Sequence, residues 1–165
     1  MLAHRVGLLT ASAAFLIAAA ATAEPLKPLR FFEGRTESAG TIKLFMKKAY
    51  GSHSVGRGVI EPDGSLLLVQ RVEDEGKAPR MRSWRIREVG SGRYAGTMSE
   101  AIGPVVIDDV GGKYRFRFKM KGNFAVEQWL VPLPGGMSAR NSMKVRKFGM
   151  TVGTSDGTIR KIASR

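Results

Sequence analysis

Hydrophobic and polar positions alternate with a period of two along most of the chain. In the clearest stretch, residues 113–120, every odd position is cationic and every even position is apolar or aromatic. This alternation is typical of a β-strand with one buried face, and helical periodicity is scarce. Comparable stretches predict strands at about 36–48, 53–61, 65–73, 81–89, 93–100, 104–109, 113–120, 124–132, 139–146 and 149–162.

Turn signals separate these stretches at intervals of about ten residues. They are Pro62-Asp63-Gly64, Gly90-Ser91-Gly92, Gly111-Gly112, Gly122-Asn123, Pro134-Gly135-Gly136 and Ser155-Asp156-Gly157. The last of them is expected to break the final strand. Short strands at this spacing predict an all-β, antiparallel barrel or sandwich of about 8–10 strands. We favour an up-and-down barrel, because closure removes exposed sheet edges. The Phe31-Phe32 pair after Pro28 is expected to form a short N-terminal turn or helix that plugs one end.

Residues 1–23 have the pattern of a secretory signal peptide. His4 and Arg5 precede an apolar run, and Ala21-Thr22-Ala23 supplies small residues before a cut that we predict before Glu24. The alternative is a retained membrane anchor, but the run is rich in alanine and short. We therefore expect residues 24–165 to form a single β-barrel domain.

Composition narrows the environment and the chemistry. The chain has no cysteine, which excludes disulfides, thiolate metal sites, a cysteine nucleophile and an acylated lipoprotein N-terminus. Together with the signal peptide, this predicts a periplasmic protein that is not a lipoprotein. The formal net charge of +13 favours polyanionic neighbours such as an anionic membrane surface or an acidic envelope polymer. Nucleic acid is not an expected partner, because export separates the protein from most of it.

Several short motifs along the chain resemble those of an uncharacterised bacterial envelope family with a domain of unknown function. Members of that family are commonly lipoproteins. The motifs are Phe31-Phe32-Glu33-Gly34, Gly40, Arg82 to Ile86, Tyr94-Ala95-Gly96, Gly103, Asn141 and Lys147-Phe148-Gly149. The resemblance covers about residues 31–162 and implies a lipocalin-like barrel. It implies no reaction. The chain departs from the family's paired acids, with Ser99-Glu100 at one place and Glu127-Gln128-Trp129 at another.

A row of cationic side chains forms the first candidate site, which would bind an anionic surface. Alternate residues of a strand lie about 6.8 Å apart on one face, so the row on residues 113–119 spans about 20 Å. If neighbouring strands carry them, the cations make one positive surface; the alternative is an ordinary solvated face. The candidates are Arg85, Arg87, Lys113, Arg115, Arg117 and Lys119.

The residues that alternate with these cations face the other side of each strand. They form the second candidate site, a ligand cavity inside the barrel. The alternative is that these side chains simply fill the core. Arg82 shares the parity of Trp84, and an inward arginine needs an anionic ligand or a protein carboxylate such as Glu127 or Asp108. The candidate ligand-binding residues are Arg82, Trp84, Tyr94, Tyr114, Phe116, Phe118 and Trp129.

Catalytic and metal-binding signals are sparse. His53 is the single histidine after the signal peptide, and Ser52 and Ser54 beside it should face the opposite side of the strand. Asp108 and Asp109 most simply serve a turn. No catalytic residue, metal site or cofactor is expected.

Three functions follow from these patterns. The first is a non-enzymatic binding or carrier protein for a hydrophobic or anionic amphiphilic, lipid-like ligand, with a basic exterior facing anionic envelope components. The second is a structural or interaction protein with a filled core and a positive surface for an acidic partner or membrane. The third is a hydrolase that uses His53. The volume and lining of the barrel interior discriminate among them.

Overall fold

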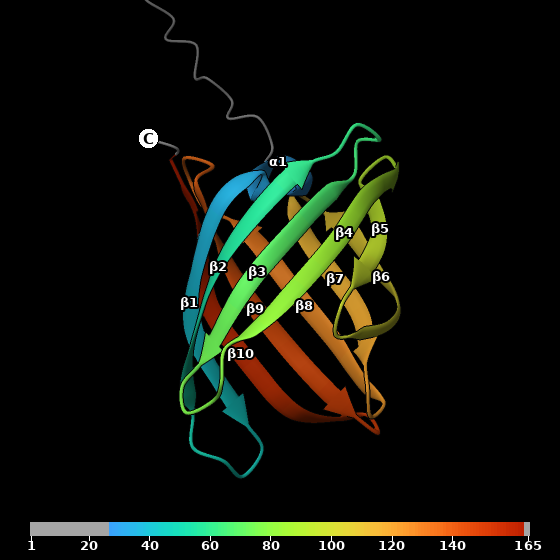
Figure 1. Ribbon diagram of the computed structural model, residues 1–165. Coiled ribbons are helices and arrows are strands. Elements are labelled where there is room, and N and C mark those ends of the chain that lie inside the picture. Colours follow the sequence, from blue (N-terminus) through green and yellow to red (C-terminus); the bar gives the residue numbers. More distant parts are fainter. Residues whose placement is uncertain (1–26, 164–165) are drawn as a thin grey trace, which may run out of the picture.

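A computed structural model describes residues 27–163; the predicted signal peptide and its cleavage site lie outside this range. One short helix, α1 (Pro28–Phe32), precedes ten strands (Figure 1). The strands are β1 (Gly34–Leu44), β2 (Tyr50–Ile60), β3 (Leu66–Asp74), β4 (Arg80–Gly90), β5 (Arg93–Met98), β6 (Ala101–Val110), β7 (Lys113–Met120), β8 (Phe124–Pro132), β9 (Ser138–Lys147) and β10 (Met150–Ile162).

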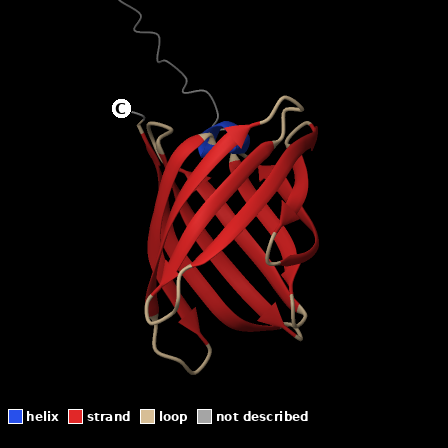
Figure 2. Cartoon of the chain, viewed as in Figure 1, coloured by secondary structure: helices blue, strands red, loops and turns tan. Residues whose placement is uncertain are grey.

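The strands form a closed antiparallel barrel in which each strand pairs with its sequence neighbours (Figure 2). The barrel closes where β1 pairs with β10, over a register that runs from Arg35 opposite Ile162 to Leu44 opposite Gly153. Gly40 faces Gly157 in this pair, and a β-carbon on either residue would overlap the backbone of the other strand. The predicted up-and-down barrel is thus confirmed, and the long β1–β10 ladder leaves neither terminal strand as an open edge.

Strand ends differ from the prediction in two instructive places. β1 ends at Leu44, where residues 45–49 turn, although the sequence alternates to about position 48. The predicted turn at Ser155-Asp156-Gly157 is wrong. These three residues continue β10 and pair, in that order, with Ile42, Thr41 and Gly40 of β1. Regular pairing on both sides holds this segment extended, so its local turn preference is overridden.

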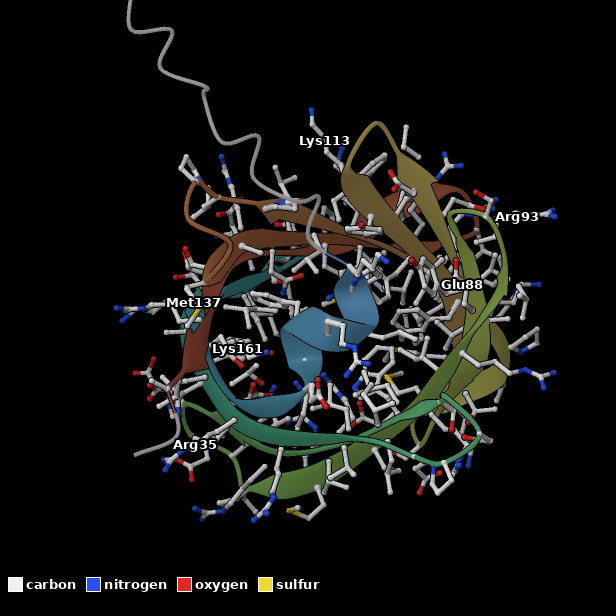
Figure 3. All side chains as sticks on the ribbon, turned by 90° about the horizontal axis from the view of Figure 1, so that it is seen from above. Arg35, Glu88, Arg93, Lys113, Met137 and Lys161 are labelled. Atoms are coloured by element: carbon white, nitrogen blue, oxygen red, sulfur yellow. The ribbon has the colours of Figure 1, made fainter. Side chains whose placement is uncertain are left out.

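Helix α1 lies across one end of the barrel (Figure 3). Pro28 occupies its first turn, where a missing amide hydrogen costs nothing, and Phe31 and Phe32 are buried. The carbonyl of Phe32 sits against β2 at Gly58, where a β-carbon would overlap it. Lys161 donates a hydrogen bond from Nζ to the carbonyl of Arg30 at 2.7 Å. The sequence-based expectation of an aromatic plug is confirmed, and we call this the closed end.

Side chains fill the barrel interior in the half next to α1. Tyr94 and Tyr114 pack edge to face there, with ring centroids 6.3 Å apart. The fully buried Leu66, Val105, Ile107, Leu130 and Ala139 belong to the same cluster. The other half is hollow, so the core is filled at one end and open at the other.

Candidate functional site

The hollow half of the barrel holds a cavity of about 800 Å³. Its lining runs from Phe32, Leu68 and Ile86 near α1 to Phe45 and Lys77 in the loops at the opposite end. Phe45 and Lys77 are exposed, so the cavity reaches solvent at that end, which we call the mouth. The volume lies within the range of small-molecule and cofactor sites. The interior can therefore hold a ligand.

Aromatic side chains form the wall of the cavity on β4 and β7. Trp84 contacts Phe116 and Phe118 edge to face, with centroid separations of 6.4 and 5.8 Å. Strand alternation brings these rings inward, because Trp84, Phe116 and Phe118 have the parity opposite to their charged neighbours. The indole Nε1 of Trp84 donates to Oε1 of Gln70 at 2.8 Å, so its polar atom is satisfied beside the cavity. This wall can contact an apolar group without losing a hydrogen bond.

Charged side chains form a network between the aromatic wall and the mouth. Asp74 is 5% exposed and accepts hydrogen bonds from Ser52 Oγ at 2.6 Å and Arg80 Nη1 at 2.7 Å. Glu100 accepts from Arg80 Nε at 2.9 Å and from Arg82 Nε at 2.6 Å. All five side chains line the cavity. We call Ser52, Asp74, Arg80, Arg82 and Glu100 the mouth network.

Contacts within the mouth network favour the charged forms of Asp74 and Arg80. Burial alone would raise the pKa of Asp74, but the hydrogen bonds from Ser52 and Arg80 and the charges of Arg80 and Lys77 lower it below the ordinary value. Burial would lower the pKa of Arg80, yet its hydrogen bonds to Asp74 and Glu100 raise it. Two arginines therefore face two carboxylates, and Lys77, 3.7 Å from Asp74, adds one further cation. With three cations and two carboxylates, the site favours an anionic group.

Neutral polar pairs complete the lining. Gln128 donates to Oδ1 of Asn141 at 2.7 Å, and the Ser38 and Ser54 hydroxyls are 2.8 Å apart. Gln128 of β8 lies directly beside Phe116 of β7, whereas Ser38 and Ser54 lie on β1 and β2, which do not neighbour β4 or β7. Neutral polar groups therefore lie both beside the aromatic wall and on strands away from it.

The structure places the seven predicted ligand-binding residues in three locations. Arg82, Trp84, Phe116 and Phe118 line the cavity. Tyr94 and Tyr114 lie outside it, in the filled half, where burial raises the pKa of the Tyr114 phenol to about 12. Trp129 is outside as well: it pairs with Ser142 away from the interior, and its ring lies against Arg115, 5.8 Å away, on the outer surface. Four of the seven candidates thus line the cavity, and ligand contact at any of the seven stays a prediction.

The partner of Arg82 also differs from the prediction. Glu100 binds Arg82, whereas Asp108 binds Arg117 outside the barrel and Glu127 contacts the Trp129 indole. Glu100 follows the short β5, and strand pairing brings it beside the start of β4. Sequence reasoning missed Asp74, Arg80 and Ser52. The shared parity of Arg80 and Arg82 was an available signal for one of them.

The predicted cationic surface is divided. β5 and β6 lie between β4, which carries Arg85 and Arg87, and β7, which carries Lys113, Arg115, Arg117 and Lys119. Asp108 on β6 pairs with Arg117 at 2.7 Å and lies 3.5 Å from Arg115, and Glu61 pairs with Arg85. β4 and β7 are therefore not neighbours, so their cations do not form one continuous positive surface. Acidic residues also neutralise part of the positive charge on each of the two strands.

His53 lies on the outside of β2, where its Nε2 is 2.8 Å from Oε1 of Glu37. Ser52 and Ser54 point the other way, toward Asp74 and Ser38. The hydrolase hypothesis thus has a histidine and a carboxylate together, but neither adjacent serine with them. Across residues 27–163, no cluster of three or more metal-ligating side chains occurs. No helix in that part of the chain is long and apolar enough to cross a membrane.

The barrel and its half-open interior define the class: a lipocalin-like antiparallel β-barrel with one plugged end. The chain belongs to the family described as "Protein of unknown function (DUF3833)", whose family model matches residues 6–161. This confirms the resemblance to a family with a domain of unknown function. Among curated proteins, none matches the sequence.

Two solved structures are similar in fold. The S-type phycobiliprotein lyase of Guillardia theta has a TM-score of 0.65 at 10% identity, over 83% of this chain and 92% of that one. A DUF3598 protein of unknown function from Nostoc punctiforme has a TM-score of 0.55 at 11% identity, over 84% of this chain. The match spans about half (51%) of the Nostoc protein. At these identities the likeness establishes the fold alone.

Proposed function

We propose that the protein is a non-enzymatic binding or carrier protein for an anionic amphiphile, held inside the barrel. The observation that carries this is a cavity of about 800 Å³ with an aromatic wall toward α1 and an arginine-rich network toward the mouth. An apolar tail would occupy the space beside Trp84, Phe116 and Phe118. An anionic head would lie near Arg80 and Arg82. That another barrel of this fold is a phycobiliprotein lyase is compatible with a ligand-holding interior.

The location belongs to the same proposal. The pattern of residues 1–23 supports export and a periplasmic site of action. Fractionation with mass spectrometry of the mature N-terminus would support this if the chain starts at Glu24 in the periplasm. A cytoplasmic protein that retains residue 1 would refute this part of the proposal.

Binding of cis-parinaric acid and of its methyl ester tests the ligand chemistry. We expect the acid to bind the wild-type protein more tightly than the uncharged ester. Arg82→Gln should weaken binding of the acid by about tenfold, because a charge-assisted hydrogen bond contributes about 1.5–3 kcal/mol, and should leave the ester nearly unchanged. Equal affinities for acid and ester in the wild-type protein would refute the anionic head group.

A cavity-filling substitution tests the location. Met143→Trp places an indole in the lining and should abolish binding of both probes. Met81→Trp makes the same change of side chain on the exterior of β4, where Met81 is exposed, and should bind like wild type. If Met143→Trp folds and binds both probes normally, the ligand does not occupy this cavity.

A further inference from the structure

Bulky apolar side chains project from the tips of two turns at the mouth of the barrel. The β1–β2 turn carries Phe45 and Met46, which are 70% and 89% exposed, and the β9–β10 turn carries Phe148, with Met150 directly after it, at 78% and 66%. The two turns are neighbours, because the amide of Phe45 donates to the carbonyl of Val152 at 2.9 Å. In Figure 1 both project from the end opposite α1, together with the β7–β8 turn. We call these four side chains the apolar tip.

Backbone geometry makes this placement unusual. Met46 and Phe148 have φ values of 56° and 50°, in the left-handed region. Glycine adopts this conformation freely, whereas a large side chain is strained there. Glycine at both positions would therefore reduce the backbone strain of the two turns. The chain instead presents methionine and phenylalanine to solvent at the tips of these two turns.

Cations surround the apolar tip. The three segments 43–50, 119–126 and 144–154 contain no aspartate or glutamate. They contain eight cations: Lys43, Lys47, Lys48, Lys119, Lys121, Lys144, Arg146 and Lys147. The Lys147 ammonium lies 4.8 Å from the ring centroid of Phe124 and 5.7 Å from that of Phe148, so charge and apolar surface are interleaved.

Acidic groups on the other side of the mouth are engaged, and on this side Glu127 of β8 lies opposite Lys144. Asp74 and Glu100 bind the arginines of the mouth network, and Glu75 accepts a hydrogen bond from the amide of Gly51 at 3.0 Å. The side formed by the β1–β2, β7–β8 and β9–β10 turns therefore carries positive charge around an apolar point. An anionic bilayer surface matches both features, since lysines attract its head groups and apolar side chains insert at the acyl boundary.

We propose that this surface docks the mouth of the barrel onto an anionic phospholipid bilayer. Met46 and Phe148 insert into the interface, and the surrounding lysines contact lipid phosphates. Because Phe45 belongs both to the apolar tip and to the cavity lining, docking sets the cavity opening against the membrane. The inference rests on the turn geometry and the charges, and it stands whether or not the cavity holds the ligand proposed above.

Vesicle co-sedimentation tests the docking surface. The wild-type protein should bind vesicles of phosphatidylcholine and phosphatidylglycerol, bind phosphatidylcholine vesicles weakly, and lose binding at high salt. Met46→Gly with Phe148→Gly should reduce binding at least about tenfold. This double variant should fold at least as stably as wild type, because glycine relieves the left-handed strain. All variants share the same full chain, so any contribution of residues 1–26 is common to them.

Matched charge variants locate the contact. Lys47→Gln with Lys48→Gln should weaken binding about fivefold or more. Arg35→Gln with Arg57→Gln removes the same charge from two exposed side chains on paired strands at the closed end and should change binding less than twofold. Equal losses in the two double variants would show attraction by net charge alone and overturn the proposal. Wild-type binding by the Met46→Gly, Phe148→Gly variant would also overturn it.

A probe gives the orientation. The chain has no cysteine, so Met46→Cys supplies a single labelling site for an environment-sensitive fluorophore. Its emission should shift to the blue with anionic vesicles, and the same label at Met137→Cys, near α1, should not shift. A blue shift at position 137 alone would mean that the opposite end docks. Met143→Trp should retain docking while losing cis-parinaric acid, which separates failure of this inference from failure of the proposed function.

Discussion

At the scale of single residues, the interior of the barrel combines charges that compensate one another. Asp74 and Glu100 hold Arg80 and Arg82 in place through ion pairs. For Asp74 and Arg80, these partners offset the loss of water on burial and favour the charged form. An arginine fixed in this way needs no side-chain reordering when an anion arrives. The mouth network is therefore organised for recognition before a ligand binds.

Asp74 gives a pH prediction at this scale. Its pKa is lowered below the ordinary value of 3.8, so the unfolded chain takes up a proton before the folded protein does as the pH falls. The stabilisation is fully present above that value and is lost as the pH falls through the lowered pKa. We expect Asp74→Asn to lose about 1–3 kcal/mol of unfolding free energy at pH 7, and the difference from wild type to shrink in acid. Urea denaturation over a pH series measures both.

Glu88→Gln serves as the control for this series. Glu88 is an exposed side chain on β4, and its removal should alter stability at pH 7 by less than about 0.5 kcal/mol. A pH-independent difference between Asp74→Asn and wild type would contradict the role assigned to the carboxylate.

At the scale of elements, α1 depends on one residue of β2. Gly58 lets the end of α1 approach the sheet, because a residue without a β-carbon leaves room for the Phe32 carbonyl. The five-residue helix is too short to be stable alone, so its position comes from burying Phe31 and Phe32 against the barrel. The plug is thus a tertiary feature built on a small local element.

Gly58→Ala should consequently destabilise the fold by about 2 kcal/mol, because the methyl group forces α1 away from β2. Gly51→Ala on the same strand is the matched control, since a β-carbon there would meet only the Glu75 carboxylate at an ordinary 3.7 Å. Urea denaturation of the two variants measures the contrast. Equal stability would mean that α1 does not pack against Gly58.

At the scale of the whole molecule, the barrel has a filled half and a hollow half. Buried contacts concentrate near α1, around Leu66, Ile107 and Leu130, whereas side chains at the mouth border the cavity. Local opening is cheapest where few buried apolar contacts are broken. The two ends of each long strand should therefore differ in stability.

Hydrogen exchange measures this difference. We expect amides near Leu66, Ile107 and Leu130 to exchange about tenfold or more slowly than amides near Met120, Phe124 and Val145. Adding cis-parinaric acid should slow exchange mainly in the second group. Uniform protection along the strands, with or without the fatty acid, would contradict the division into two halves.

Much of the architecture was available from the sequence. Period-two alternation and regularly spaced glycine turns located the strands, because each strand must bury one face and each short connection needs backbone geometry that glycine supplies. The parity of Arg82, Trp84, Phe116 and Phe118 also identified four lining residues correctly. Trp129 was misassigned because apolar residues on both faces of β8 leave parity ambiguous there.

The sequence by itself therefore determined the strands, the antiparallel barrel and the inward faces of β4 and β7. Only the tertiary structure decided that Asp74 and Glu100 meet Arg80 and Arg82, that half of the interior is hollow, and that barrel closure places the turns of Met46 and Phe148 side by side. The physical reason is that alternation acts within a strand, whereas strand tilt, register and closure set which residues of distant strands meet and how much space they leave.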